Sequence, residues 1–293
     1  MQPIRTIGIA LILSIVAIAS TFALARQVAS APTATRTYPG AAPCNTTLQA
    51  CLDGSLAGDV INILPGVYTQ SFTLNKAVSV IGAGADTTIL KAPPNTRILT
   101  VTAVMDSSTI ISGLTFMGGN VTGHGGAILI NHPAQPLLHS LIITGNRATS
   151  NGGGVYFGSN VDTFKISNSR FENNTADAGG GLFVYYNTVL LEVTDSRVIS
   201  NSAQTYTTLF NSGGAIYLAG LGTILNSDFE RNAAGSSECS RSSATSAASS
   251  PTSSCSYSNT TSYTPGVAVS RVLPKVTLTP ATFCSSMATC SNT

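Results

Sequence analysis

The side chains that could carry acid–base chemistry in this sequence are few and far apart. Asp and Glu together number 12 in 293 residues, and no two Asp are adjacent. Cleavage of a glycosidic bond requires a general acid and a second carboxylate or a base within about 10 Å of it. The candidates are Glu172 and Glu230, which each directly follow a phenylalanine, and His124, which lies between two glycines. Whether these side chains meet depends on the elements that carry them.

An internal repeat defines those elements. A Gly-Gly-(Ala or Gly)-apolar motif occurs four times, and its glycine pairs are Gly125 and Gly126, Gly152 and Gly153, Gly179 and Gly180, and Gly213 and Gly214. A second motif, an apolar residue followed by two others and Asn, ends at Asn120, Asn146, Asn174, Asn201 and Asn232. The glycine pairs step by 27, 27 and 34 residues, and the asparagines by 26, 28, 27 and 31. Two motifs that advance in phase indicate a repeat architecture.

The repeat unit predicts an all-β solenoid. Each unit holds two or three short alternating strands, such as Ala127–Ile130 and Leu138–Ile143, which are too short to form a stable sheet alone. Coiling the chain pairs each strand with its equivalent about 4.8 Å away in the next unit. We therefore expect a right-handed parallel β-helix, with a short N-terminal capping helix over residues 48–56. Val155 and Phe157 then stack inside on Leu182 and Val184, unless the opposite strand phase faces inward.

Both motifs have structural roles in such a coil. Asn tolerates left-handed backbone geometry at a sharp corner, and its amide can bond to the Asn of the next coil to form a ladder. The glycine pairs stand where the chain turns tightly and must accept positive φ. Neither motif indicates a ligand.

The N-terminal segment places the chain outside the cytoplasm. Residues 7–25 are apolar or small and end in Ala23-Leu24-Ala25. This pattern predicts a signal peptide over residues 1–25, and the alternative is an uncleaved membrane anchor. Residues 26–43 are rich in Ala, Pro and Thr and are predicted to be a linker to the β-helix, which covers residues 44–234. Cys44 and Cys51 are close enough in sequence to form a disulfide there.

The last segment, residues 235–293, differs from the rest. It holds 17 Ser and 10 Thr in 59 positions and four of the six cysteines, without either repeat motif. It is predicted to be disordered or to be read out of frame. The net charge of +2 predicts no nucleic-acid partner, and the spacing of the Cys and His residues predicts no metal site.

Two family resemblances follow from these motifs. The segment Leu48–Leu90 resembles the opening coils of the pectin-lyase-like β-helix superfamily, through the strand Asp59–Ile63 and the turns Pro65–Tyr68 and Val80–Gly84. The repeats resemble those of polymorphic outer-membrane proteins, whose signatures are GGAI and FxxN. The matches are GGAI at Gly125–Ile128 and Gly213–Ile216, and FxxN at Phe171–Asn174 and Phe229–Asn232. The resemblance implies an exported surface protein, often an adhesin.

The first resemblance also raises the question of catalysis. Polygalacturonases carry a Gly-His-Gly motif like that around His124, but with an Asp-Asp pair that this chain lacks. Glu172 and Glu230 share a repeat phase two coils apart, roughly 10 Å at 4.8 Å per coil, while Asp195 and Asp228 share none. The sequence therefore predicts no catalytic residue and no cofactor.

One loop remains as a binding candidate. Eleven residues separate Asn201 from Gly213, against four between Asn174 and Gly179. Extra residues in one coil form a loop, in which Tyr206 and Phe210 could stack on sugars; the alternative is a tolerated insertion.

The function predicted from the sequence is that of a non-catalytic, secreted or bacterial cell-surface β-helix in adhesion or the envelope. Its partner is a polysaccharide or another cell surface, and it meets a membrane only through an uncleaved N-terminal segment. The alternatives are a polysaccharide lyase or glycoside hydrolase, and a truncated product without function.

Overall fold

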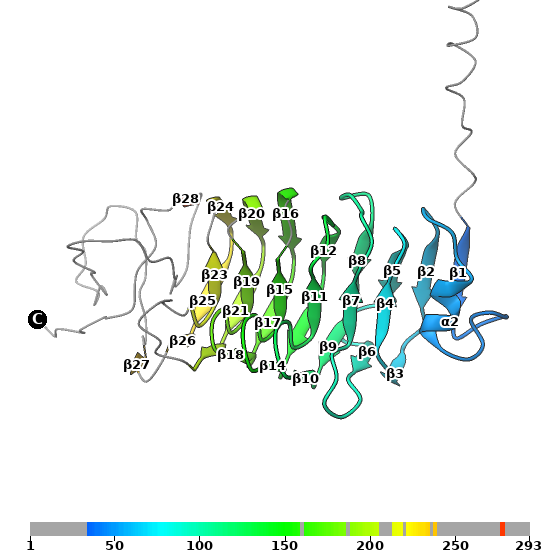
Figure 1. Ribbon diagram of the computed structural model, residues 1–293, viewed down its shortest axis with the longest axis horizontal. Helices are drawn as coiled ribbons and strands as arrows, with labels where there is room; N and C mark the ends of the chain where they lie inside the picture. The colour runs from blue at the N-terminus through cyan, green and yellow to red at the C-terminus, as the bar shows by residue number, and fades with distance from the viewer. Residues whose placement is uncertain are drawn as a thin grey trace, which may run out of the picture. The chain divides into compact units, whose positions relative to one another are not determined.

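The chain forms a parallel β-solenoid (Figure 1). The computed structural model describes residues 34–158, 161–185, 188–204, 213–218, 221–234, 237–238 and 276–278. Short strands from successive coils line up into four sheets that run along the solenoid. One of these sheets has seven strands, one from each of seven successive coils. The all-β solenoid predicted from the repeat is therefore confirmed.

Each coil passes through the sheets in the same order, which we name A, B, D and C. Sheet A contains β1 Thr35–Tyr38, β2 Val60–Ile63, β5 Ser79–Gly82, β8 Ile110–Ser112, β12 Leu137–His139, β16 Val161–Ser167, β20 Thr188–Thr194, β24 Leu221–Leu225 and β28 Val276–Leu278. Sheet B contains β3 Gly66–Thr69, β6 Thr88–Lys91, β9 Thr115–Met117, β13 Ile142–Thr144, β17 Arg170–Glu172, β21 Arg197–Ile199 and β25 Asp228–Glu230.

The other two sheets complete the coil. Sheet D is short and contains β10 Asn120–Val121, β14 Arg147–Ala148, β18 Thr175–Ala176, β22 Ser202–Ala203, β26 Ala233–Ala234 and β27 Ser237–Glu238. Sheet C contains β4 Phe72–Leu74, β7 Leu99–Val101, β11 Ile128–Ile130, β15 Val155–Phe157, β19 Leu182–Val184 and β23 Ile216–Leu218. The early coils, before β10, contribute no strand to sheet D.

The hydrophobic core is one continuous column inside the coils. In sheet C, Val155 pairs with Leu182 and Phe157 with Val184, and all four side chains are buried in that core. Sheet B contributes one inward side chain from each strand, for example Phe116, Ile143 and Phe171. Because strand side chains alternate in direction, this register fixes which residues face outward.

The predicted strand Leu138–Ile143 is two strands with a corner between them. β12 ends at His139 and β13 begins at Ile142, and Ser140 between them has φ of 52°. A residue with left-handed backbone geometry bends the chain sharply, so the chain leaves sheet A and enters sheet B here. The following coils turn at the same place through Asn168, Asp195 and Asn226, with φ of 47°, 50° and 47°.

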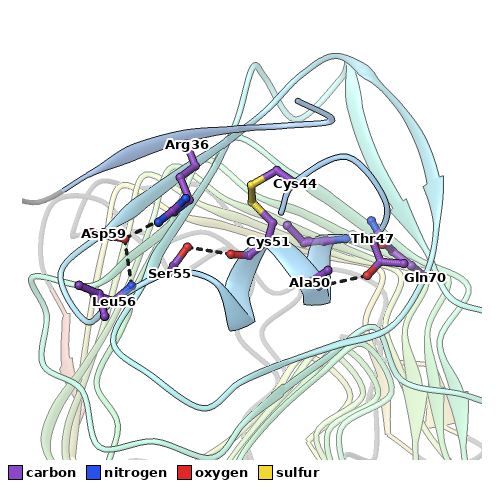
Figure 2. The surroundings of a disulfide bond; sticks show 10 residues. Arg36, Cys44, Thr47, Ala50, Cys51, Ser55, Leu56, Asp59 and Gln70 are labelled. Carbon is purple, nitrogen blue, oxygen red and sulfur yellow. Dashed lines mark hydrogen bonds and ion pairs between the residues drawn. A yellow bond between two sulfur atoms is a disulfide. The ribbon is translucent and has the colours of Figure 1, made fainter. Parts of the chain in front are cut away.

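The N-terminal end is closed by a short helix, α2, over Leu48–Asp53 (Figure 2). Its N-cap is Thr47, whose Oγ1 accepts the Ala50 N–H at 3.1 Å, and Cys44 and Cys51 form a disulfide beside it. The helix ends three residues before the predicted Leu56, because Gly54 caps it and the Leu56 N–H donates to Asp59.

The predicted linker over residues 26–43 is wrong for its described part. Thr35–Tyr38 forms β1, which pairs in parallel with β2 and begins sheet A. Buried Asp59 accepts hydrogen bonds from the backbone N–H groups of Ala34 and Leu56, at 2.8 and 2.9 Å, and pairs with Arg36 at 3.7 Å. These bonds fasten a Pro- and Thr-rich segment to the solenoid that its composition does not mark as a strand.

In the Ser/Thr-rich tail, the structure describes only β27 and β28. They pair in antiparallel fashion with β26 and β24. Among the described residues, no helix has the length and apolar character needed to cross a membrane.

Candidate functional site on the outer faces of the solenoid

His124 belongs to an aromatic cluster, and its contacts in the described part of the chain are with Tyr156, Asn151 and Arg97. Its ring stacks on Tyr156 with centroids 4.5 Å apart, and its Nδ1 accepts the Asn151 N–H at 3.3 Å. The Arg97 guanidinium donates to the carbonyl oxygens of His124 and Gly125. Burial, and to a lesser extent Arg97, lowers the pKa of His124 below its ordinary value. The arrangement positions a neutral imidazole as part of the turn before β11.

An aromatic column continues from His124 along the outside of sheet C. Tyr156, Phe183 and Tyr217 stand at equivalent outward positions of β15, β19 and β23. The Tyr156 and Phe183 centroids lie 5.3 Å apart, and those of Phe183 and Tyr217 lie 4.4 Å apart with ring planes at 2°. The three residues are only 5–8% exposed. Their faces pack on each other, so the column chiefly ties coils together.

The sequence contains a signal for this aromatic column, which is the apolar character of both faces of the sheet C strands. The strands after the glycine pairs are apolar at both phases, as in Val155-Tyr156-Phe157. A strand that is apolar on both faces is buried on both faces. The repeat predicts the inner phase alone, whereas in the structure the outer aromatic phase forms a second packed surface.

Glu172 and Glu230 are engaged in ion pairs on the outside of sheet B. They occupy the same column with Ile199 between them, so the predicted two-coil separation is present. Glu172 pairs with Arg170 at 2.9 Å. Glu230 lies 3.7 Å from Arg197 and 3.6 Å from Arg231. Within the described residues, both carboxylates are thus paired with arginines.

The other two acidic candidates are also separate from each other. Asp195 accepts a hydrogen bond from the Asn226 side chain at 3.2 Å at the corner between sheets A and B. Asp228 faces outward on β25, 3.9 Å from Arg197. The described residues include no group of three or more His, Cys, Asp or Glu side chains that could hold a metal ion.

Four of the five motif asparagines form a buried ladder at the corner between sheets B and D. Asn146, Asn174 and Asn201 each donate the backbone N–H and one amide hydrogen to the Oδ1 of the Asn in the next coil. These distances are 3.1 and 3.0 Å from Asn146 to Asn174, 3.0 and 2.9 Å from Asn174 to Asn201, and 3.0 and 3.0 Å from Asn201 to Asn232. The second amide hydrogen of each Asn bonds to a backbone carbonyl of the preceding coil.

Asn120 is not part of this ladder, which corrects its assignment from the motif. Phe116 pairs with Ile143, so the residue opposite Asn146 is Gly119. The Gly119 N–H donates to the Asn146 Oδ1 at 2.8 Å, and a Cβ at Gly119 would collide with the carbonyl oxygen of Gly126. Asn120 is exposed at the start of β10 and pairs with Arg147, one position past the ladder. In this coil the inward residue is Phe116, while the motif begins one residue later, at Met117.

A second ladder, of serines, lies at the corner between sheets A and B. Leu141 N–H donates to Ser169 Oγ at 3.2 Å, Ser169 N–H to Ser196 Oγ at 3.1 Å, and Ser196 N–H to Ser227 Oγ at 3.2 Å. Each serine stands two residues before the inward apolar residue of the Asn motif. This spacing could have revealed the ladder in the sequence.

The two glycines have different roles in the pairs that begin at Gly125, Gly152 and Gly179, whereas Gly213, which begins the fourth pair, lacks the predicted positive φ. Gly152 has φ of +69°, as the predicted tight turn requires, and Gly125 and Gly179 are similar, with +67° and +62°. Gly153 has no positive φ, but a Cβ there would lie 2.5 Å from the Gly180 carbonyl oxygen of the next coil. The same close approach between coils occurs at Gly126, Gly180 and Gly214. The second glycine therefore allows the coils to stack, because any side chain at its position would collide with the backbone of the next coil.

Residues 140–158 match the family model described as the Chlamydia polymorphic membrane protein repeat. This segment runs from the Ser140 corner through β13, β14 and β15, and it contains Asn146 and the Gly152 pair. It therefore covers the sheet B, D and C part of one coil. No curated protein and no solved structure matches the chain. Tyr206 and Phe210 lie outside the described residues.

Proposed function

We propose that the chain is a non-catalytic, extracytoplasmic surface solenoid that serves in adhesion or as an envelope component. The observation that carries this proposal is the polymorphic membrane protein repeat over residues 140–158, which forms most of one coil. Its name links the repeat to membrane proteins of a bacterial envelope. The apolar segment over residues 7–25, which the sequence predicts to direct export, supports the same compartment.

The inter-coil ladders support a scaffold role. The asparagine, serine and aromatic columns repeat the same contacts from coil to coil, so the coils form a stiff rod. Each coil contacts chiefly its neighbours, which is the arrangement that gives solenoids their extended binding surfaces. A rod whose outward carboxylates Glu172 and Glu230 are ion-paired suits presentation of a surface more than enclosure of a substrate.

The compartment is tested on intact cells of the source organism. A membrane-impermeant amine reagent should modify Lys165, whose side chain is 49% exposed. Modification of Lys165 only after the cells are broken would contradict a surface location.

The alternative enzyme is tested directly. The purified chain should release neither unsaturated nor reducing ends from pectin, polygalacturonate or alginate, with or without calcium, because Glu172 and Glu230 are paired with arginines and His124 packs on Tyr156. Turnover that is lost in His124→Ala would make the chain an enzyme. Binding without turnover that is lost when Tyr206 and Phe210 are both changed to Ala would support the predicted sugar-binding loop.

A further inference from the structure

Large exposed apolar side chains are concentrated in the first coil of the described chain. Four large hydrophobic residues are conspicuously exposed in the described part of the chain, and three of them lie within one segment of twelve residues: Leu56 at 66%, Leu64 at 46% and Val67 at 65%. The fourth is Val104, at 69%. Isolated exposed residues are ordinary, but a concentration of them at one end of a rod marks an interaction surface.

Leu64 lies beside further exposed apolar residues, and Val67 follows it three residues later on β3. The Leu64 N–H donates to the Tyr38 carbonyl oxygen at 2.8 Å, which brings it next to the loop Pro39–Pro43. In that loop Pro39, Ala41 and Ala42 are exposed. We call Pro39, Ala41, Ala42, Leu64 and Val67 the N-terminal patch. It contains no charged residue, and the disulfide and the Gly40–Cys44 hydrogen bond of 2.9 Å hold its loop in place.

The chain that precedes the patch contains its longest apolar run. Residues 7–25 are apolar or small, and eight residues separate them from Ala34. A chain of eight residues reaches no further than about 29 Å when fully extended. Ala34 leads directly into β1, the terminal strand of sheet A, and the patch begins at Pro39, where β1 has ended. The described chain therefore enters the solenoid at the strand that the patch adjoins.

We propose that residues 7–25 remain attached as a membrane anchor and that the N-terminal patch rests on the lipid surface, with the solenoid extending away from it. A short tether gives the patch an effective concentration on the order of millimolar at the surface. A small apolar area is then sufficient for docking, although it could not recruit an untethered protein. The net charge of +2 gives little attraction to anionic lipid, so the contact is apolar.

The absence of tryptophan from the chain permits a direct test. The full chain carrying Val67→Trp is reconstituted in phosphatidylcholine vesicles whose acyl chains are brominated. The matched control is Ile142→Trp, which lies in the same outward column of sheet B three strands further on, about 14 Å at 4.8 Å per coil. Bromine quenches a ring that enters the boundary of the acyl chains, about 5–10 Å deep.

We expect several-fold quenching and a blue shift for Val67→Trp and a solvent-like spectrum for Ile142→Trp. Adding Leu64→Asp to Val67→Trp should remove the quenching, whereas adding Val104→Asp should not. Equal spectra for the two tryptophan variants would overturn the proposal. Recovery from the source membrane of a chain that lacks residues 1–25 would also overturn it, and would leave the proposed surface function intact.

Discussion

Asn174→Ala should destabilise the solenoid far more than the same change at Asn120, although both residues end the same sequence motif. Asn174 is fully buried, and its side chain makes four hydrogen bonds. It donates to Ile143 O at 2.8 Å and to Asn201 Oδ1 at 2.9 Å, and it accepts from the backbone and the side chain of Asn146 at 3.1 and 3.0 Å. Asn120 is exposed, and its side chain makes one bond of 3.4 Å to Asn95.

The magnitude follows from the groups left behind. Alanine removes all four bonds and leaves the Asn146 N–H buried without its acceptor. At about 1 kcal/mol net for each bond, with an added penalty for buried unpaired groups, the loss is about 3–5 kcal/mol. Asn120→Ala should cost less than about 0.5 kcal/mol, as expected for an exposed position.

The measurement is urea unfolding of the full chain, followed by circular dichroism near 218 nm. Solenoids can unfold in parts, so amide hydrogen exchange in β13, β17 and β21 should be measured as well. We expect protection to fall in these strands in Asn174→Ala and to be unchanged in Asn120→Ala. Equal shifts for the two variants would show that the ladder does not stabilise the coils.

Three further predictions concern the aromatic column and the N-terminal cap. Phe183→Ala should cost about 3–5 kcal/mol, because it opens a cavity between the stacked Tyr156 and Tyr217 rings; a change below 1 kcal/mol in the urea midpoint analysis would mean that the column is not packed. Changing Cys44 and Cys51 together to Ser should lower stability by about 2–3 kcal/mol, the entropy of closing so short a loop, and adding reductant to the native chain should reproduce the loss. The backbone N–H of Leu56 is the main cause that holds the pKa of Asp59 below its usual value, so its stabilising effect is complete above about pH 4 and disappears as the pH falls through the lowered pKa. Asp59→Asn should therefore flatten the acid limb of the stability profile, and an unchanged limb would contradict this assignment.

The N-terminal cap shows where local pattern was insufficient. The helix at Leu48 was predictable from its apolar spacing, but β1 was not. Thr35–Tyr38 lies in a segment rich in Ala, Pro and Thr, and nothing local separates it from a linker. It is a strand because Asp59, more than twenty residues later, binds the Ala34 N–H and Arg36. Such a long-range contact produces no periodic pattern in the local sequence.

The outer surface shows the same limit. The shared phase of Glu172 and Glu230 could be read from the repeat, but their pairing with Arg170, Arg197 and Arg231 depends on which strands are neighbours. The stacking of His124 on Tyr156 likewise joins a turn to the strand of the next coil. Residues about one repeat apart are adjacent in space, and only the register states which of them meet.

The sequence by itself determined the architecture of this protein. Glycine pairs and asparagines that advance together by about 27 residues allow few structures other than stacked coils. The tertiary structure alone decided the register. A displacement of one residue exchanges an inward for an outward side chain, and the register between β9 and β13 places Gly119, not Asn120, beside Asn146. The motif specifies the type of residue a corner needs, while the packing of neighbouring coils determines which residue occupies it.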